Sequence, residues 1–126
     1  MPAASIAFRL NPHHPRWYEA FLGRLLYQLR RYAEAGPLLE LGGSPSPVRE
    51  LRHIGWRAAN SAQLGHGEEA HRLAGVFVTS AAALWREDEQ TGPAEFVNWL
   101  VDSSSLQAPA DIENLRVGLA LAGLPG

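Results

Sequence analysis

The stretch YQLRRYAEA at residues 27–35 recurs as AQLGHGEEA at residues 62–70, with no gap and an offset of 35 residues. The two copies share glutamine, leucine, glutamate and alanine at equivalent positions. In each copy the stretch contains a short turn between two segments whose apolar residues have helical spacing. A unit of about 34 residues that contains a helix, a tight turn and a second helix is a helical hairpin. The recurrence therefore predicts an array of stacked helical hairpins.

The apolar residues on both sides of the repeat also follow the helical period. Between Pro15 and Leu29 the gaps between apolar residues alternate between one and three, which is typical of a helix and not of a strand. We expect further helices from Tyr32 to Gly42-Gly43, from Pro47 to Gly65 or Gly67, from Ala70 to Trp85, from Ala94 to Val101 and from Ala110 to Ala122. No segment alternates convincingly with period two, so the predicted fold class is all-α.

Composition excludes several classes of protein. A chain of 126 residues is long enough for one domain or a short repeat array, and it contains no cysteine, so disulfide frameworks, thiolate metal sites and thiol nucleophiles are excluded. The net charge of −2 argues against a nucleic-acid partner, and the apolar stretches are too short to span a membrane. All basic residues are arginine, which together with abundant alanine, glycine and proline is typical of a GC-rich genome. We expect a bacterial, cytoplasmic protein.

The repeat resembles the tetratricopeptide repeat (TPR) over roughly residues 15 to 82. In the first copy, Leu22-Gly23 match the first helix of that family, Tyr32 and Ala35 match the second, and Pro47 falls at the closing proline. Arg30 replaces the usual turn glycine. In the second copy the matching residues are Leu64, Gly65 and Ala70, whereas Ala58 and Gly67 replace the helix glycine and the aromatic residue.

The flanks resemble the C-terminal TPR regions of bacterial multidomain regulators, such as adenylate cyclases and winged-helix regulators. The resemblance rests on Phe8 to Pro12 before the repeats and on the closing segment Pro109 to Pro125. It implies a short right-handed superhelix of antiparallel hairpins with a divergent C-terminal helical pair. The expected divisions are the end of a preceding repeat at 1–14, a first repeat at 15–47, a second at 48–92 with an extended second helix, and capping helices at 93–126.

The resemblance also implies where a partner binds. The first helices of TPR hairpins line a concave groove that takes an extended peptide or a helix of a partner. The groove candidates that we expect to contact a protein or peptide partner are Trp17, Arg24, Tyr27, Gln28, Arg52 and Gln63. Two alternatives stay open: the aromatic residues pack against the N-terminal segment, and the arginines form a solvated face. The lysines and asparagines with which some family members clamp a C-terminal carboxylate are missing.

Residues that suggest a metal site or catalysis lack the required pattern. His66 and His71 are five residues apart, so on a helix they would differ by about 140° in direction and could not share a metal ion. We interpret them, with His13-His14 and His53, as surface or capping histidines. The serines at 103–105 lack the glycines of a nucleophile elbow, and no phosphate-binding glycine loop occurs. The sequence therefore predicts no catalytic residues, no metal and no cofactor.

The expected function is non-catalytic. We predict a module for protein–protein interaction or self-association within a signalling protein, with a homodimer formed through the uncovered N-terminal end. The alternative is a small-ligand sensor or a small enzyme with a tryptophan-lined pocket, for which Arg24, Arg57 and Asn60 are the polar candidates. We expect Trp56, Trp85 and Trp99 to fill the core between the repeats.

Overall fold

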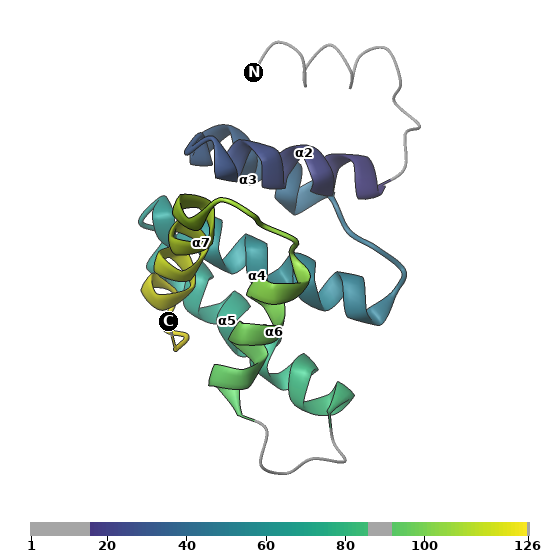
Figure 1. Ribbon diagram of the computed structural model, residues 1–126. Helices are drawn as coiled ribbons and strands as arrows, with labels where there is room; N and C mark the ends of the chain where they lie inside the picture. Colours follow the sequence, from purple (N-terminus) through teal and green to yellow (C-terminus); the bar gives the residue numbers. More distant parts are fainter. Residues whose placement is uncertain (1–15, 86–91, 126) are drawn as a thin grey trace.

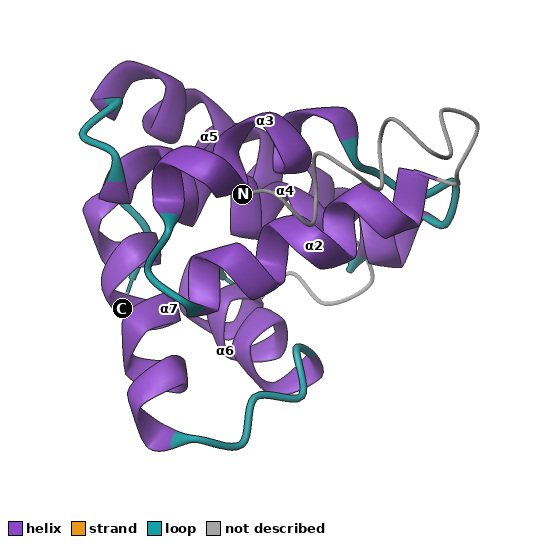
Figure 2. Ribbon diagram, turned by 90° about the horizontal axis from the view of Figure 1, so that it is seen from above, coloured by secondary structure: helices purple, strands orange, loops and turns teal. Residues whose placement is uncertain are grey.

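The computed structural model describes residues 16–85 and 92–125 (Figure 1). These ranges contain six α-helices, which are α2 (Arg16–Gln28), α3 (Tyr32–Leu41), α4 (Pro47–Gln63), α5 (Gly67–Leu84), α6 (Pro93–Ser103) and α7 (Pro109–Leu121). Within them the chain forms only helices and loops, as Figure 2 shows from above. The predicted all-α class is confirmed. The predictions for residues 1–14, including that for His13-His14, lie outside the described residues.

Local sequence signals account for the helix boundaries. Ser46 caps α4, since its hydroxyl accepts a hydrogen bond from the backbone N–H of Arg49, and Pro47 occupies the first helical position. Helix α3 ends at Gly42, as predicted, and it begins at Tyr32 with Pro37 inside it. Tertiary contacts of α3 therefore override the unfavourable effect of an internal proline.

Consecutive helices pair as hairpins. Helix α2 packs against α3, α4 packs against α5, and α3 joins the two pairs by packing on α4 (Figure 1). The α2–α3 pair approaches closely at Gly23, where an added Cβ would lie 2.7 Å from the side chain of Leu39. Ala35 and Ala70, the small residues that match between the two copies of the repeat, are both completely buried. Small residues therefore set the close approach of the helices in each hairpin.

The C-terminal helices are arranged differently. Helix α7 packs mainly on α4 and has only sparse contact with its neighbour in sequence, α6 (Figure 1). Gly118 of α7 faces Tyr27 of α2 and Ala59 of α4, and a Cβ there would lie 2.9 Å from the Cβ of Ala59. Helix α7 thus lies on the face shared by the first helices of the two hairpins.

The tryptophans occupy the interior to different degrees. Trp56 is buried, packs edge-on against Tyr27 at 5.3 Å between ring centroids, and donates its indole N–H to Ser104 Oγ at 3.1 Å. Trp85 and Trp99 are half-buried and contact each other, with ring centroids 5.3 Å apart. The prediction that these residues fill the core is confirmed for Trp56, while Trp85 and Trp99 form the edge of the core beside α6.

Candidate functional site

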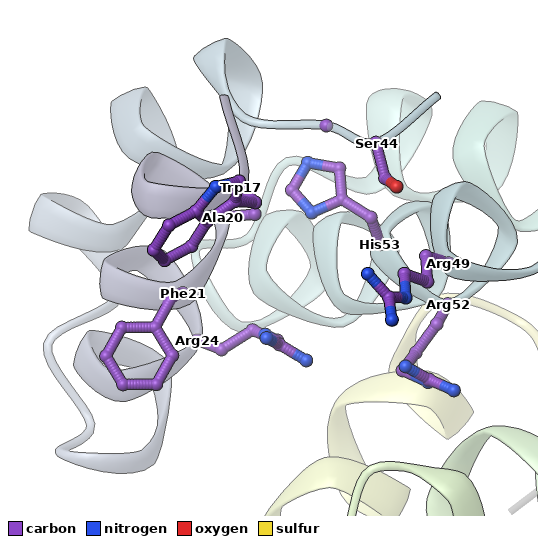
Figure 3. A pocket seen from close by; sticks show the side chains of 9 residues that line it. Trp17, Ala20, Phe21, Arg24, Ser44, Arg49, Arg52 and His53 are labelled. Carbon is purple, nitrogen blue, oxygen red and sulfur yellow. The ribbon is translucent and has the colours of Figure 1, made fainter. Parts of the chain in front are cut away.

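Five of the six groove candidates lie in two separate regions. Trp17, Arg24 and Arg52 line one open pocket between α2, the loop after α3, and α4, with a cavity volume of about 430 Å³ (Figure 3). Tyr27 and Gln63 lie instead beneath α7. Gln28 lies at the end of α2, where its carbonyl accepts a hydrogen bond from Arg30. We call the first region the arginine pocket; its lining residues are Trp17, Ala20, Phe21, Arg24, Gly43, Ser44, Arg49, Arg52 and His53.

The region under α7 is closed by hydrogen bonds to one residue, Asn114. Tyr27 Oη donates to the Asn114 backbone carbonyl at 2.8 Å, and Tyr32 Oη donates to Asn114 Oδ1 at 2.8 Å. Gln63 Nε2 donates to Asn114 Oδ1 at 3.3 Å. Tyr27 is only 1% exposed, and burial raises the pKa of its phenol. These side chains hold α7 in place.

Arg30 extends the same attachment to the first turn of α7. Its guanidinium donates to Asp111 Oδ1 at 2.8 Å and to the Ala110 carbonyl at 3.1 Å. The backbone of Arg30 has a φ of 61°, in the left-handed region that favours glycine. Glycine adopts this conformation without strain, and at Arg30 the contacts with α7 stabilise it.

The arginine pocket carries unbalanced positive charge. Arg24 reaches from α2 toward Arg49 and Arg52 on α4, and no acidic residue lines the pocket (Figure 3). Burial and, second, the charge of Arg52 lower the pKa of Arg24, and burial and Arg49 lower that of Arg52. Arg52 Nε donates to Ser103 Oγ at 3.1 Å, and its guanidinium lies 5.7 Å from the Trp99 ring centroid. Within the described residues neither Arg24 nor Arg49 forms an ion pair.

Glu50, which follows Arg49 on α4, directs its carboxylate at the loop between α3 and α4. It accepts a hydrogen bond from the backbone N–H of Ser44 at 3.0 Å. Glu50 is therefore engaged in fixing the loop that forms one wall of the pocket. The positive charge of the pocket is not compensated by any side chain that lines it.

His53 is a buried member of the pocket lining. Its side chain is 5% exposed, and Nε2 lies 2.7 Å from the carbonyl oxygen of Leu39. Because a carbonyl only accepts, Nε2 carries the proton of this bond. Nδ1 is buried without a hydrogen-bond partner among the described residues. An unsatisfied buried polar atom of this kind costs about 1–3 kcal/mol.

Burial is the main cause that lowers the pKa of His53, and the charges of Arg57 and Arg24 lower it further. The hydrogen bond to Leu39 and the charge of Glu50 act in the opposite direction. The imidazole is therefore neutral at pH 7, with Nδ1 as an unpartnered acceptor. The interpretation of His53 as a surface or capping residue was wrong, because the carbonyl of Leu39 on another helix holds the ring inside.

An aromatic rim lies beside the arginines. Trp17 is 60% exposed and Phe21 is 46% exposed, and both project from α2 one helical turn apart (Figure 3). Large apolar side chains next to guanidinium groups are typical of interface positions with high binding energy. The pocket can thus accommodate a ligand with a negative group and an apolar group side by side.

Phe21, Arg49 and His53 are among the pocket residues that sequence reasoning missed. The signal for Arg49 and His53 was present in the sequence. Arg52 and His53 follow Arg49 by three and four residues, so each lies near Arg49 on the surface of the helix. Among the described residues, no group of three His, Asp or Glu side chains could hold a metal ion. No helix in the described part of the chain is both long enough and apolar enough to cross a membrane.

Comparison with known proteins gave no match: no protein-family model, curated protein or solved structure resembles this chain significantly.

Proposed function

We propose that the chain is a non-catalytic, TPR-like recognition module that binds an acidic peptide segment of a partner protein in the arginine pocket. The observation that supports this most is the convergence of Arg24, Arg49 and Arg52 on one cavity whose lining contains no acidic side chain. The resemblance to TPR regions of bacterial regulators supports the same class of function.

Without a ligand, the guanidinium group of Arg24 is in an unfavourable environment. Arg24 is partly desolvated and repelled by Arg52, and within the described residues no carboxylate offsets either effect. A carboxylate between the two arginines would form charge-assisted hydrogen bonds, which are about twice as strong as neutral ones. An apolar side chain of the same peptide would lie against Trp17 and Phe21.

Calorimetric titration with a peptide of glutamate and leucine, acetylated and amidated at its ends, tests the proposal. We expect binding that weakens as salt is added, because salt screens the attraction. A peptide with glutamine in place of glutamate should not bind. The variant with both Arg24→Gln and Arg52→Gln should bind the acidic peptide at least about tenfold more weakly.

The matched control is Arg72→Gln, which removes an exposed arginine of α5 that pairs with Glu69 at 2.6 Å, outside the pocket lining. Its affinity should equal that of the unsubstituted chain. Circular dichroism should show the same helix content in all variants. Equal binding of the glutamine peptide, or unchanged affinity of the double variant, would contradict the proposal.

A second candidate function is self-association through α2. Exposed apolar side chains follow one another at four-residue intervals: Trp17, Phe21 and Leu25 on this helix and Leu29 in the turn directly after it. Such a stripe is larger than scattered exposed residues on a monomer and is typical of a docking surface. Sedimentation velocity at high micromolar concentration tests it. We expect a dimer that Leu29→Glu dissociates, and a monomer at that concentration would exclude this candidate.

A further inference from the structure

One buried polar atom at the arginine pocket is not explained by the fold. His53 points from α4 toward Trp17 and Ala20 of α2 (Figure 3), and its Nδ1 has no partner among the described residues. The other ring nitrogen is fixed on the Leu39 carbonyl. A buried side-chain atom without a hydrogen-bond partner calls for an explanation, and beside an open pocket a bound ligand is one.

We infer that the arginine pocket binds the carboxylate of its ligand together with one proton, which His53 takes up on Nδ1. The inference rests on the proposed function, because it assigns the acidic group of the peptide to the end of the pocket next to His53. It adds a regulatory property, because the affinity for a ligand depends on pH when binding is coupled to proton uptake.

The charges around the imidazole of His53 explain why ligand binding is coupled to its protonation. Arg24 faces the ring from α2, and Arg49, Glu50, Arg52 and Arg57 belong to α4. Helix α3 contributes the neutral Leu39 carbonyl. Without a ligand, burial and the arginine charges keep the ring neutral. A carboxylate seated between the arginines compensates their charge and offers an acceptor for an N–H at Nδ1, so the bound state favours the protonated ring.

The opposite assignment, a ligand that donates a hydrogen bond to neutral His53, fits the pocket less well. A strong donor of that kind would be an ammonium group, and three guanidinium groups around it would repel it. A carboxylate is attracted by the same groups. The two assignments also differ in outcome, because a donating ligand would bind without proton uptake.

The expected pH dependence follows from linkage. Protonation accompanies binding at pH values above the pKa of His53 in the free chain, which lies below its usual 6.5. Affinity should therefore rise as the pH falls from 8 toward 6, by up to about tenfold per pH unit for one proton. Affinity should become constant once the ring is protonated in both states.

Titration calorimetry on the unsubstituted chain, in two cationic buffers with different ionisation enthalpies, counts the protons. The probes are sulfate and the blocked peptide of glutamate and leucine, because neither titrates between about pH 6 and pH 8. We expect uptake approaching one proton with both probes. A variant with His53→Gln keeps a donor for the Leu39 carbonyl, and its binding should be independent of pH over this range.

A direct measurement keeps the test valid if His53→Gln disturbs the fold. In the unsubstituted chain, nuclear magnetic resonance of the imidazole should show that the pKa of His53 rises when sulfate is added. Peptide binding without proton uptake overturns the inference and leaves the proposed function standing. Sulfate binding with proton uptake, combined with no peptide binding, overturns the proposed function and leaves only the coupling of anion binding to protonation of His53. Binding of neither probe overturns both.

Discussion

The two ends of the face shared by α2 and α4 differ in how their polar side chains are satisfied. At one end Tyr27 and Gln63 meet the backbone and side-chain oxygens of Asn114 on α7. At the other end Arg24 and Arg49 have no ion pair within the described residues, and His53 has a buried nitrogen without a partner. The first end is a packing interface within the chain, and the second has the properties of a site for a ligand.

The side chains themselves account for this difference. Gly118 lets α7 approach Tyr27 and Ala59 closely, and the hydroxyl of Tyr27 and the amide of Gln63 find acceptors on Asn114, although Asn114 Nδ2 is itself buried without a partner among the described residues. Covering the arginines with a similar helix would remove charged groups from water without carboxylates to pair with them, which is strongly unfavourable. Helix α7 therefore closes only the neutral end of the face.

Gly118→Ala, at the closed end of the face, should have the largest effect on the free energy of unfolding. The new methyl group would lie 2.9 Å from Ala59 Cβ and 3.1 Å from the Ala59 carbonyl oxygen, and closer still to Tyr27 Oη. We expect the free energy of unfolding, measured with urea, to fall by about 2 kcal/mol. The matched control is Gly75→Ala in α5, where nothing lies within 4 Å; it should stabilise the chain by up to about 1 kcal/mol. Equal effects of the two substitutions would mean that α7 is not packed here.

Tyr27→Phe should have the next largest effect. It removes the hydrogen bond from Tyr27 Oη to the Asn114 carbonyl, so we expect a loss of about 1 kcal/mol in urea unfolding. Because the oxygen that meets the new methyl group is gone, Tyr27→Phe combined with Gly118→Ala should be less destabilising than the sum of both. Peptide affinity should not change. A loss of affinity with Tyr27→Phe would place Tyr27 in the binding site and remove the distinction between the two ends.

Arg24→Met, a substitution at the open end of the face, should leave the free energy of unfolding almost unchanged. The guanidinium is repelled by Arg52 and forms no ion pair within the described residues, so its removal relieves repulsion while the methionine keeps the apolar contacts. We expect the free energy of unfolding to stay within about 0.5 kcal/mol of the unsubstituted value. Peptide binding should nevertheless weaken. A clear loss of stability would show that Arg24 is a structural residue, like Tyr27.

His53→Gln should change how stability depends on pH, and this is the smallest effect. The folded chain holds the pKa of His53 below its usual 6.5, so the unfolded chain binds the proton more readily. This contribution to stability is present above about pH 6.5 and is lost as the pH falls toward the folded pKa. Urea unfolding between pH 7 and pH 5 should therefore be less steeply dependent on pH in the variant. Identical slopes would mean that folding does not lower the pKa of His53.

Sequence reasoning predicted the helices well because their signals are local. The alternating gaps from Trp17 onward, the Ser46-Pro47 start and the glycines after α3, α4 and α7 act within a few residues. Trp17, Arg24 and Arg52, which the family resemblance placed in one groove, line one pocket. Helical spacing puts Trp17 and Arg24 on one face of α2, and the packing of α4 beside α2 brings Arg52 to them. It could not show that Tyr27 and Gln63 are covered, since Asn114 lies 87 residues after Tyr27 in the chain.

By itself, then, the sequence determined the all-α class, the hairpin period of 35 residues and the face on which the arginines lie. The tertiary structure alone decided which part of that face stays open and that His53 lies inside. The physical reason is that burial and hydrogen bonding at these positions come from other helices, α7 for Tyr27 and α3 for His53. Spacing along one helix specifies the direction of a side chain, and only the packing of helices specifies what it meets.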